Sequence, residues 1–346
     1  MSSPPSGINR FRAYLQFIAA VLYFFLARSF AGRAAQGFGT EAWRPLAEQA
    51  ILAALLILGY AAMGLVLDRQ IHPIREQGLG RRPGWPHEAG LGLAFGWGLA
   101  VVCVLAMVLA GGIAIVLVPG LSAWGWLLAD AAFFALAALA EEVAFRGYGF
   151  QRFANAVGPL GAALGFAAYY AIVQSLTPGA NHASIAVSIA FSLLLSTAYL
   201  RTKALCLSWG INFAWKASRA LLFGLAISGV NVHSPVVQGD PMGSFWLTGG
   251  GYGLDGSWFA FFVLIVSLPL LFKVTRDLDF RYNAPVLVPA GIPVDLDAAG
   301  RRQHEAAMGS AQPAGTTLVQ ILPVSSQVAP GPEPTKPDNE SAGEPR

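Results

Sequence analysis

The sequence predicts an all-α membrane protein, a polytopic bundle of about eight transmembrane helices followed by a disordered C-terminal tail. Hydrophobic residues make up 55% of the 346 residues and charged residues only 12%, whereas a soluble globular protein carries about 25% charged residues. The mean hydropathy is +0.54, and only six charged residues lie between Glu88 and Leu200. So few charges cannot solvate the surface of a globule, so the composition excludes an ordinary soluble enzyme.

Eight apolar stretches are long enough to cross a bilayer, whose hydrocarbon core of about 30 Å takes about 20 helical residues. The first is short and has arginines at both ends, so it could instead lie in the membrane interface. The fourth contains no helix breaker before Gly158-Pro159, so we expect it to continue to about Val157 with the glutamate pair inside it. In chain order the stretches are 12–28, 48–67, 89–118, 121 to about 157, 160–176, 183–200, 204–228 and 257–274.

Lys and Arg gather in alternate loops, and this bias predicts the orientation. Residues 68–87 hold four arginines, whereas the loops around Pro119 and Pro178 hold no Lys or Arg. Because basic loops stay in the cytoplasm, we expect both termini there, in a bacterial inner membrane. The predicted organisation is a cytoplasmic tail at 1–11, a transmembrane helical domain at 12–280 and a disordered tail, rich in Pro, Ala and Gly, at 281–346.

Several functional classes are excluded by what the chain lacks. The net charge is only +3 and no basic stripe is interleaved with aromatics, so we expect no nucleic-acid partner. Cys103 and Cys206 lie in apolar stretches and predict neither a disulfide framework nor a zinc site. The glycine run at 249–253 is not followed by the Lys of a phosphate loop, so it predicts an external, turn-rich loop.

Three charges inside the fourth stretch are the candidates for chemistry. Each charge at the centre of a transmembrane helix costs about 2.5–3.5 kcal/mol, so Glu141, Glu142 and Arg146 need compensation. Glu142 and Arg146 are four residues apart on one helix face and can neutralise each other. Glu141 points about 100° away, on nearly the same face as Asp130, so both could line one polar cavity. The cluster is therefore either a helix end at the membrane interface or a carboxylate held in an apolar cavity as a candidate general base.

The string EEVAFRG at 141–147 resembles the EExxxR motif of the CPBP family, the CAAX-prenyl-protease-type and bacteriocin-processing intramembrane glutamic endopeptidases. FRGYGFQRF, YLRT at 199–202, GINFAWK at 210–216 and WLTGGGYGLDG at 246–256 resemble further family landmarks in family order. The resemblance covers about 121–255. It implies hydrolysis of a peptide bond in a membrane-associated or lipidated substrate, without a cofactor, by water that a glutamate activates.

Carried over residue by residue, the resemblance makes Glu141 the general base and Glu142 the partner of Arg146. The family's FxxxH motif falls on 170–174 and its HxxxN motif on 212–216, so Gln174 and Asn212 replace both histidines and Lys216 replaces the asparagine. The Gln174 amide can orient a water molecule but cannot accept its proton. Asn212 and Lys216 can donate hydrogen bonds to an oxyanion. These positions do not supply the His and Cys ligands that zinc favours, so we expect no metal.

Two local alternatives concern the remaining charged or basic groups. His182, eight residues beyond Gln174, is either a solvated loop histidine or a substitute for a missing one. Lys216 and Arg219 either snorkel toward the interface, or Lys216 forms a salt bridge with a glutamate of the pair. If Gln174 and Asn212 share one site, residues 175–181 must dip into the protein interior.

Two functions remain in competition. The first is an intramembrane endopeptidase, which the intact EEVAFRG favours. The second is a non-catalytic membrane protein on the same scaffold that binds a peptide, a lipidated chain or a partner, and the missing histidines favour it. A transporter would show discontinuous helices in both halves of the chain, and no such symmetry is present.

Overall fold

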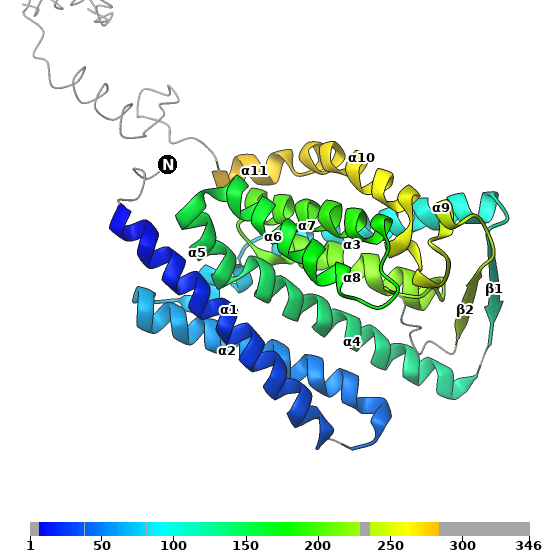
Figure 1. Cartoon of the computed structure of the whole chain (residues 1–346), viewed down its shortest axis with the longest axis horizontal. Coiled ribbons are helices and arrows are strands. Elements are labelled where there is room, and N and C mark those ends of the chain that lie inside the picture. The colour runs from blue at the N-terminus through cyan, green and yellow to red at the C-terminus, as the bar shows by residue number, and fades with distance from the viewer. Residues whose placement is uncertain (1–6, 38, 81, 119, 229–235, 284–346) are drawn as a thin grey trace, which may run out of the picture. The chain divides into compact units, whose positions relative to one another are not determined.

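The computed structural model describes residues 7–37, 39–80, 82–118, 120–228 and 236–283, and Figure 1 shows their arrangement. The predicted tail at 281–346 falls almost wholly outside the described residues. Within them the chain forms eleven α-helices and one two-stranded antiparallel sheet. The elements are α1 (Gly7–Gln36), α2 (Arg44–Asp68), α3 (Trp85–Leu109), β1 (Ile113–Leu117), α4 (Leu121–Arg146), α5 (Tyr148–Val157), α6 (Pro159–Ser175), α7 (His182–Thr202), α8 (Leu205–Ala217), β2 (Val237–Pro241), α9 (Phe245–Thr248), α10 (Trp258–Val274) and α11 (Arg276–Asn283).

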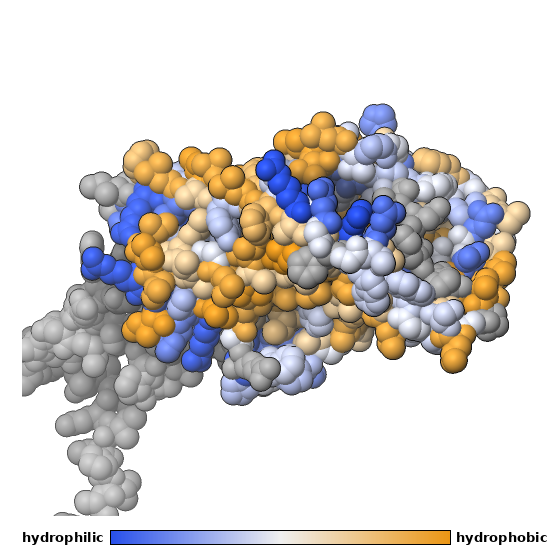
Figure 2. All heavy atoms as spheres, turned by 90° about the horizontal axis from the view of Figure 1, so that it is seen from below, coloured by the Kyte–Doolittle hydropathy of each residue, from blue (hydrophilic) through white to orange (hydrophobic). Residues whose placement is uncertain are grey.

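The predicted class, an all-α membrane bundle, is confirmed. Five helical segments are long and apolar enough to cross a membrane, and α10 is a shorter apolar helix. Large apolar side chains cover much of the outer surface, as Figure 2 shows from one side. A surface of this kind is stable in lipid, so the protein is an integral membrane protein. The 30 residues of α1 would extend about 45 Å, which is enough to span the hydrocarbon core.

Two of the predicted helices are shorter than expected. The stretch 89–118 is not one helix, because α3 ends at Leu109 and the β-branched run Ile113–Leu117 forms β1 and pairs with β2. The stretch 204–228 ends early, since α8 stops at Ala217 and one π-helical turn follows to Leu222.

The fourth stretch ends at Val157 as expected, but it is broken at Gly147 into α4 and α5, so it is not one continuous helix. Gly147 has φ −77° and ψ −140°, outside the helical region, and a Cβ there would collide with the carbonyl oxygen of Val143. The glutamate pair consequently lies in the second-last turn of α4, and not in the middle of a longer helix. After the break, α5 turns the chain toward α6.

Small residues let α3 and α8 pack with their backbones in contact. A Cβ on Gly210 would lie 2.7 Å from the carbonyl oxygen of Ala89, and one on Gly96 would collide with the carbonyl oxygen of Ile211. Such close approach is typical of glycine-mediated packing between membrane helices. On the other side of α8, the Trp209 indole donates a 3.0 Å hydrogen bond to the carbonyl oxygen of Ala135 on α4. Helix α8 is therefore fixed between α3 and α4, with Asn212 and Lys216 on it.

Polar networks join the helix ends at one end of the bundle, on the left in Figure 1. Asp68 at the end of α2 accepts hydrogen bonds from Gln16, Tyr148 and Arg152 at 2.9, 2.8 and 3.1 Å. Most of the basic loops lie at this end, although α1 carries Arg28 and Arg33 toward the other. Further links here are Arg82 with Glu88 and Arg201 with Asp279.

Candidate active site

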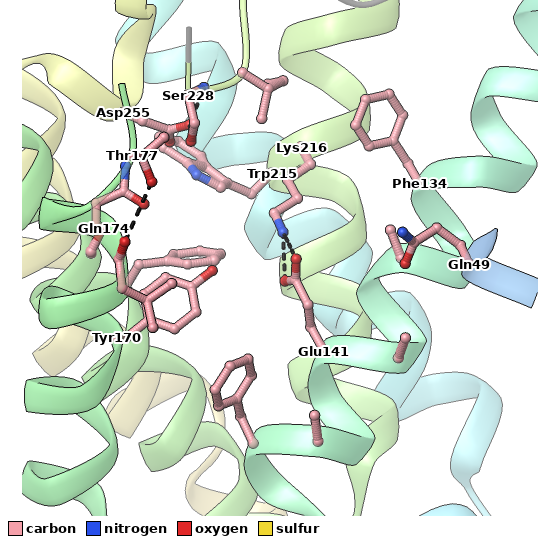
Figure 3. Close-up of a pocket in the computed structure, with 18 of the residues that line it drawn as sticks. Gln49, Phe134, Glu141, Tyr170, Gln174, Thr177, Trp215, Lys216, Ser228 and Asp255 are labelled. Carbon is pink, nitrogen blue, oxygen red and sulfur yellow. Dashed lines mark hydrogen bonds and ion pairs between the residues drawn. The ribbon is translucent and has the colours of Figure 1, made fainter. Parts of the chain in front are cut away.

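A cavity of about 590 Å³ lies among α1, α2, α4, α6, α7 and α8, and Figure 3 shows its interior. We call it the site cavity. Aromatic and aliphatic side chains make up 14 of its 26 lining residues, and the other twelve are polar or charged. The side chains that bear carboxylate, amide, ammonium, guanidinium or hydroxyl groups are Arg28, Gln49, Glu141, Tyr169, Tyr170, Gln174, Thr177, Ser188, Lys216, Arg219, Ser228 and Asp255.

Glu141 is the carboxylate of the motif that faces this cavity. Its side chain keeps 30% of its surface exposed, and the Nζ of Lys216 lies 2.5 Å from both carboxylate oxygens. Asn212 bridges the two glutamates, because its Nδ2 donates to Glu141 at 3.0 Å and to Glu142 at 2.9 Å. Two donors from α8 therefore hold Glu141, and the salt bridge that the sequence left open is formed with this residue.

Glu142 and Arg146 point into the protein, away from the site cavity. Their side chains are 0% and 1% exposed, and Arg146 Nη1 lies 3.4 Å from Glu142 Oε1. Arg146 also donates to the carbonyl oxygen and hydroxyl of Ser192 at 3.2 and 3.3 Å. Burying two ions costs several kcal/mol each, so the pair needs these additional hydrogen bonds. This pair connects α4 to α7 and has no access to a ligand in the cavity.

Tyr170 and Gln174 face the site cavity from α6, one helical turn apart. Figure 3 shows them across the cavity from Glu141 and Lys216, with the Tyr170 ring directed inward. The Tyr170 ring packs edge-on against Phe145 at 5.4 Å. Gln174 donates a hydrogen bond to the hydroxyl of Tyr252. The Tyr170 hydroxyl receives no hydrogen bond from any residue that the structure describes, so it is available to a ligand.

The part of the chain that builds the site cavity is similar to a known protein family. Residues 122–218 match the family described as type II CAAX prenyl endopeptidase Rce1-like. The matched segment is similar to this family and makes up 97 of the 346 residues. The match contains all six candidate residues, from Glu141 to Lys216. No curated protein and no solved structure matches the chain.

The matched segment brings most of the predicted site residues together. Glu141, Gln174 and Lys216 line the site cavity, and Asn212 is fully buried behind Glu141. Thr177 also lines it, but every residue of 175–181 is exposed or half-buried, so this segment does not enter the protein interior as expected. Asp130, which was expected on the same cavity, is not among the residues lining it.

None of the described histidines lies in the site cavity. His182 is the exposed first residue of α7, where a capping box between Asn181 and Ser184 begins the helix. His72 and His87 are also exposed, and His233 and His304 lie outside the described residues. No group of three or more His, Cys, Asp or Glu within the described ranges could hold a metal ion.

A second charged cluster, which the sequence did not reveal, closes one end of the site cavity. Arg219 is fully buried and lies 2.6 Å from Asp255, so it does not snorkel. Asp255 also accepts hydrogen bonds from the amide and hydroxyl of Ser228 at 3.1 and 3.0 Å. The guanidinium stacks 4.2 Å above the Trp215 ring. The available signals in the sequence were an arginine inside an apolar stretch and one acidic residue in an otherwise uncharged loop.

The glycine-rich segment 245–256, here named the covering loop, is therefore not an external loop. Leu254 and Gly256 are buried, and Gly249 and Gly253 have φ of +71° and +77°, which L-residues rarely adopt. Burial, and secondarily the Asp255 carboxylate, raise the pKa of Tyr252 above its ordinary value. The turns were predicted correctly, but the loop packs against α7 and covers the site cavity.

Proposed function

We propose that this protein is an intramembrane endopeptidase that hydrolyses a peptide bond in a membrane-associated or lipidated protein. The observation that carries the proposal is the position of Glu141, a partly exposed carboxylate in an apolar cavity beside the donors Lys216 and Asn212. The similarity of residues 122–218 to the type II CAAX prenyl endopeptidase family supports peptide-bond hydrolysis as the reaction class. A peptide segment or lipidated chain suits a cavity whose wall combines aromatic and aliphatic side chains with polar groups that can bind a peptide backbone.

The proposed chemistry uses the groups of this chain alone. Glu141 accepts a proton from water, and the water oxygen attacks the carbonyl carbon of the scissile bond. Negative charge then develops on the carbonyl oxygen, which the Lys216 ammonium and the Tyr170 hydroxyl can stabilise with hydrogen bonds. As the C–N bond breaks, the protonated Glu141 returns its proton to the leaving amine.

The ion pair imposes a condition on this reaction. In the free protein Lys216 contacts both oxygens of Glu141, so the base is occupied. A substrate carbonyl oxygen has to draw the ammonium toward itself before Glu141 can accept a proton. Gln174 can position the water but not deprotonate it, and the loss of a second base costs about 10²–10⁴-fold in rate.

The same ion pair favours a second candidate, a non-catalytic protein that binds a peptide, a lipidated chain or a partner in the site cavity. A carboxylate held by an ammonium at 2.5 Å and by an amide is a poor base unless the contacts open. In this alternative Glu141, Lys216 and Asn212 fix the shape of the cavity and cleave nothing.

We further propose that the protein lies in a bacterial inner membrane with both termini in the cytoplasm, as the basic loops predict. Its expected partners are a peptide or lipidated protein substrate and the surrounding lipid. Fusing a reporter that is active only in the cytoplasm to Arg346 tests the orientation: an inactive reporter contradicts it.

The variant Glu141→Gln distinguishes the endopeptidase from the non-catalytic binding protein. It keeps the size of the side chain and its ability to form hydrogen bonds, but it removes the base. Membranes from cells expressing the wild type, Glu141→Gln or the exposed control Glu76→Gln are compared by mass spectrometry of new peptide termini. Hydrolysis predicts termini that occur with the wild type and Glu76→Gln and fall about 10²–10⁴-fold with Glu141→Gln. Identical termini in all three would contradict the endopeptidase and leave the binding function.

A further inference from the structure

A second cavity of about 490 Å³ lies outside the site cavity, at the end of the bundle where the polar networks join the helices. We call it the basic pocket. It is formed between the loop that connects α2 to α3 and the turn that connects α7 to α8. Its lining residues are Arg75, Gly78, Gly80, Arg82, Pro83, Lys203 and Ala204.

The α2–α3 loop and the α7–α8 turn, which form the two walls of the basic pocket, are held in place by contacts with each other and with neighbouring helices. Gly78 has φ +88°, and a Cβ on it would lie 3.0 Å from the Cα of Ala204, so the loop backbone rests directly on the α7–α8 turn. Arg82 donates a 2.7 Å hydrogen bond to the carbonyl oxygen of Thr202 at the end of α7. Arg82 also pairs at 2.6 Å with Glu88, which is fully buried. The pocket is therefore a built feature and not a gap between mobile side chains.

The charge inside the basic pocket is not balanced. Three of its lining residues are cationic and none is a carboxylate. Glu88 compensates Arg82, whereas neither Arg75 nor Lys203 forms an ion pair with any carboxylate in the described part of the chain. Burial lowers the pKa of Lys203, and the more distant Asp279 carboxylate raises it. Arg75 and Lys203 therefore bring two uncompensated positive charges to one concave surface, and an anion bound there would neutralise both.

The chemistry of the lining favours a phosphate group over other anions. A guanidinium and an ammonium are the side chains that proteins use for phosphate, and basic pockets between membrane helices bind lipid headgroups. Arg75 and Lys203 are exposed, so a ligand can reach them. Ala204 directly precedes α8 and Pro83 lies two residues before α3, so the pocket is at the first turns of these two helices. We propose that the basic pocket binds a phosphate group, carried by an anionic phospholipid or by a soluble anion.

The test measures binding by the full chain in detergent and does not depend on proteolysis. Phosphatidylglycerol is titrated while native mass spectrometry follows bound lipid, with the double variant Arg75→Gln/Lys203→Gln against the wild type. The matched control is Arg69→Gln/Lys273→Gln, which removes one Arg and one Lys that are exposed and outside the pocket. Arg69 and Lys203 share a backbone φ of +53°, so both variants have the same local strain.

The pocket variant should bind phosphatidylglycerol roughly 30-fold more weakly, and the control should bind like the wild type. A parallel titration with inorganic phosphate distinguishes the two sources. Displacement of the lipid by phosphate identifies a site for the phosphate group itself, and resistance to displacement identifies a headgroup site. Equal losses in the two double variants, or wild-type binding by the pocket variant, would overturn the proposal because the attraction would then be general surface charge.

Discussion

Glu141 and Glu142 are neighbours in the sequence, yet they lie in two different regions of the molecule. Glu142 is 0% exposed and pairs with Arg146 one turn away on the same helix. Glu141 is 30% exposed, faces the site cavity, and takes its cation from α8, 75 residues further along the chain. A rotation of about 100° between adjacent helix positions is enough to separate them.

The two glutamates of one motif in a membrane helix therefore have different roles, one in holding helices together and one at a cavity. The Glu142–Arg146 pair is enclosed, bonded to Ser192 and inaccessible to a ligand, so its role is to join α4 to α7. The Glu141–Lys216 pair borders open space, so its contacts can be exchanged for contacts with a ligand.

The largest effect on stability is expected at the enclosed pair. Arg146→Met leaves Glu142 buried without a cation, which should lower the free energy of unfolding by about 3–5 kcal/mol. Lys216→Met removes a cation from a carboxylate that the cavity can solvate, so its cost should be about 1 kcal/mol. Denaturant unfolding in detergent measures both variants. Equal losses in the free energy of unfolding would mean that the Glu141–Lys216 pair is as important for stability as the Glu142–Arg146 pair.

The next effect is expected at the covering loop. Asp255→Asn removes the charge that neutralises the buried Arg219, and hydrogen bonds to charged groups contribute about 1.5–3 kcal/mol. The loop at 245–256 should then exchange its amide hydrogens faster. Hydrogen–deuterium exchange measures this directly, and the exposed Asp240→Asn provides the control. Unchanged exchange in the loop would show that Asp255 does not hold it closed.

A smaller effect is expected where α3 approaches α8. Gly96→Ala introduces a Cβ against the Ile211 carbonyl, which should cost about 1–3 kcal/mol and shift the neighbouring Asn212 relative to Glu141. Gly98→Ala on the same helix meets open space and should be neutral or slightly stabilising. Thermal unfolding of both variants tests this, and similar melting temperatures would contradict the close packing.

The smallest effect concerns alkaline pH. The pKa of Tyr252 is raised in the folded protein above its ordinary value of 10.0, so the folded state holds this proton more tightly than the unfolded state. Its contribution to stability is complete below pH 10 and is lost as the pH rises through the folded pKa. Above pH 10, the free energy of unfolding of Tyr252→Phe should depend less on pH than that of the wild type. Denaturant unfolding at several pH values measures this, and identical slopes for the two proteins would contradict it.

Local patterns explain what the sequence could predict. Apolar stretches located the main helices, and a spacing of four residues predicted the Glu142–Arg146 pair. The break at Gly147 was not predictable, because it depends on a backbone conformation that no flanking proline marks. Ion pairs between distant segments were equally hidden: Arg219 and Asp255 are 36 residues apart, and only the fold brings them together. For Lys216 the sequence offered two partners and an interfacial alternative, and packing of α8 against α4 selected Glu141.

The most direct test of the division between the two glutamates is one experiment on both conservative variants. Glu141→Gln and Glu142→Gln are purified in parallel, and each is measured for unfolding stability and for generation of new peptide termini in its membranes. We expect Glu141→Gln to remain folded and to produce about 10²–10⁴-fold fewer termini, whereas Glu142→Gln loses stability. A stable Glu142→Gln protein, or a Glu141→Gln protein that processes substrates like the wild type, would contradict it.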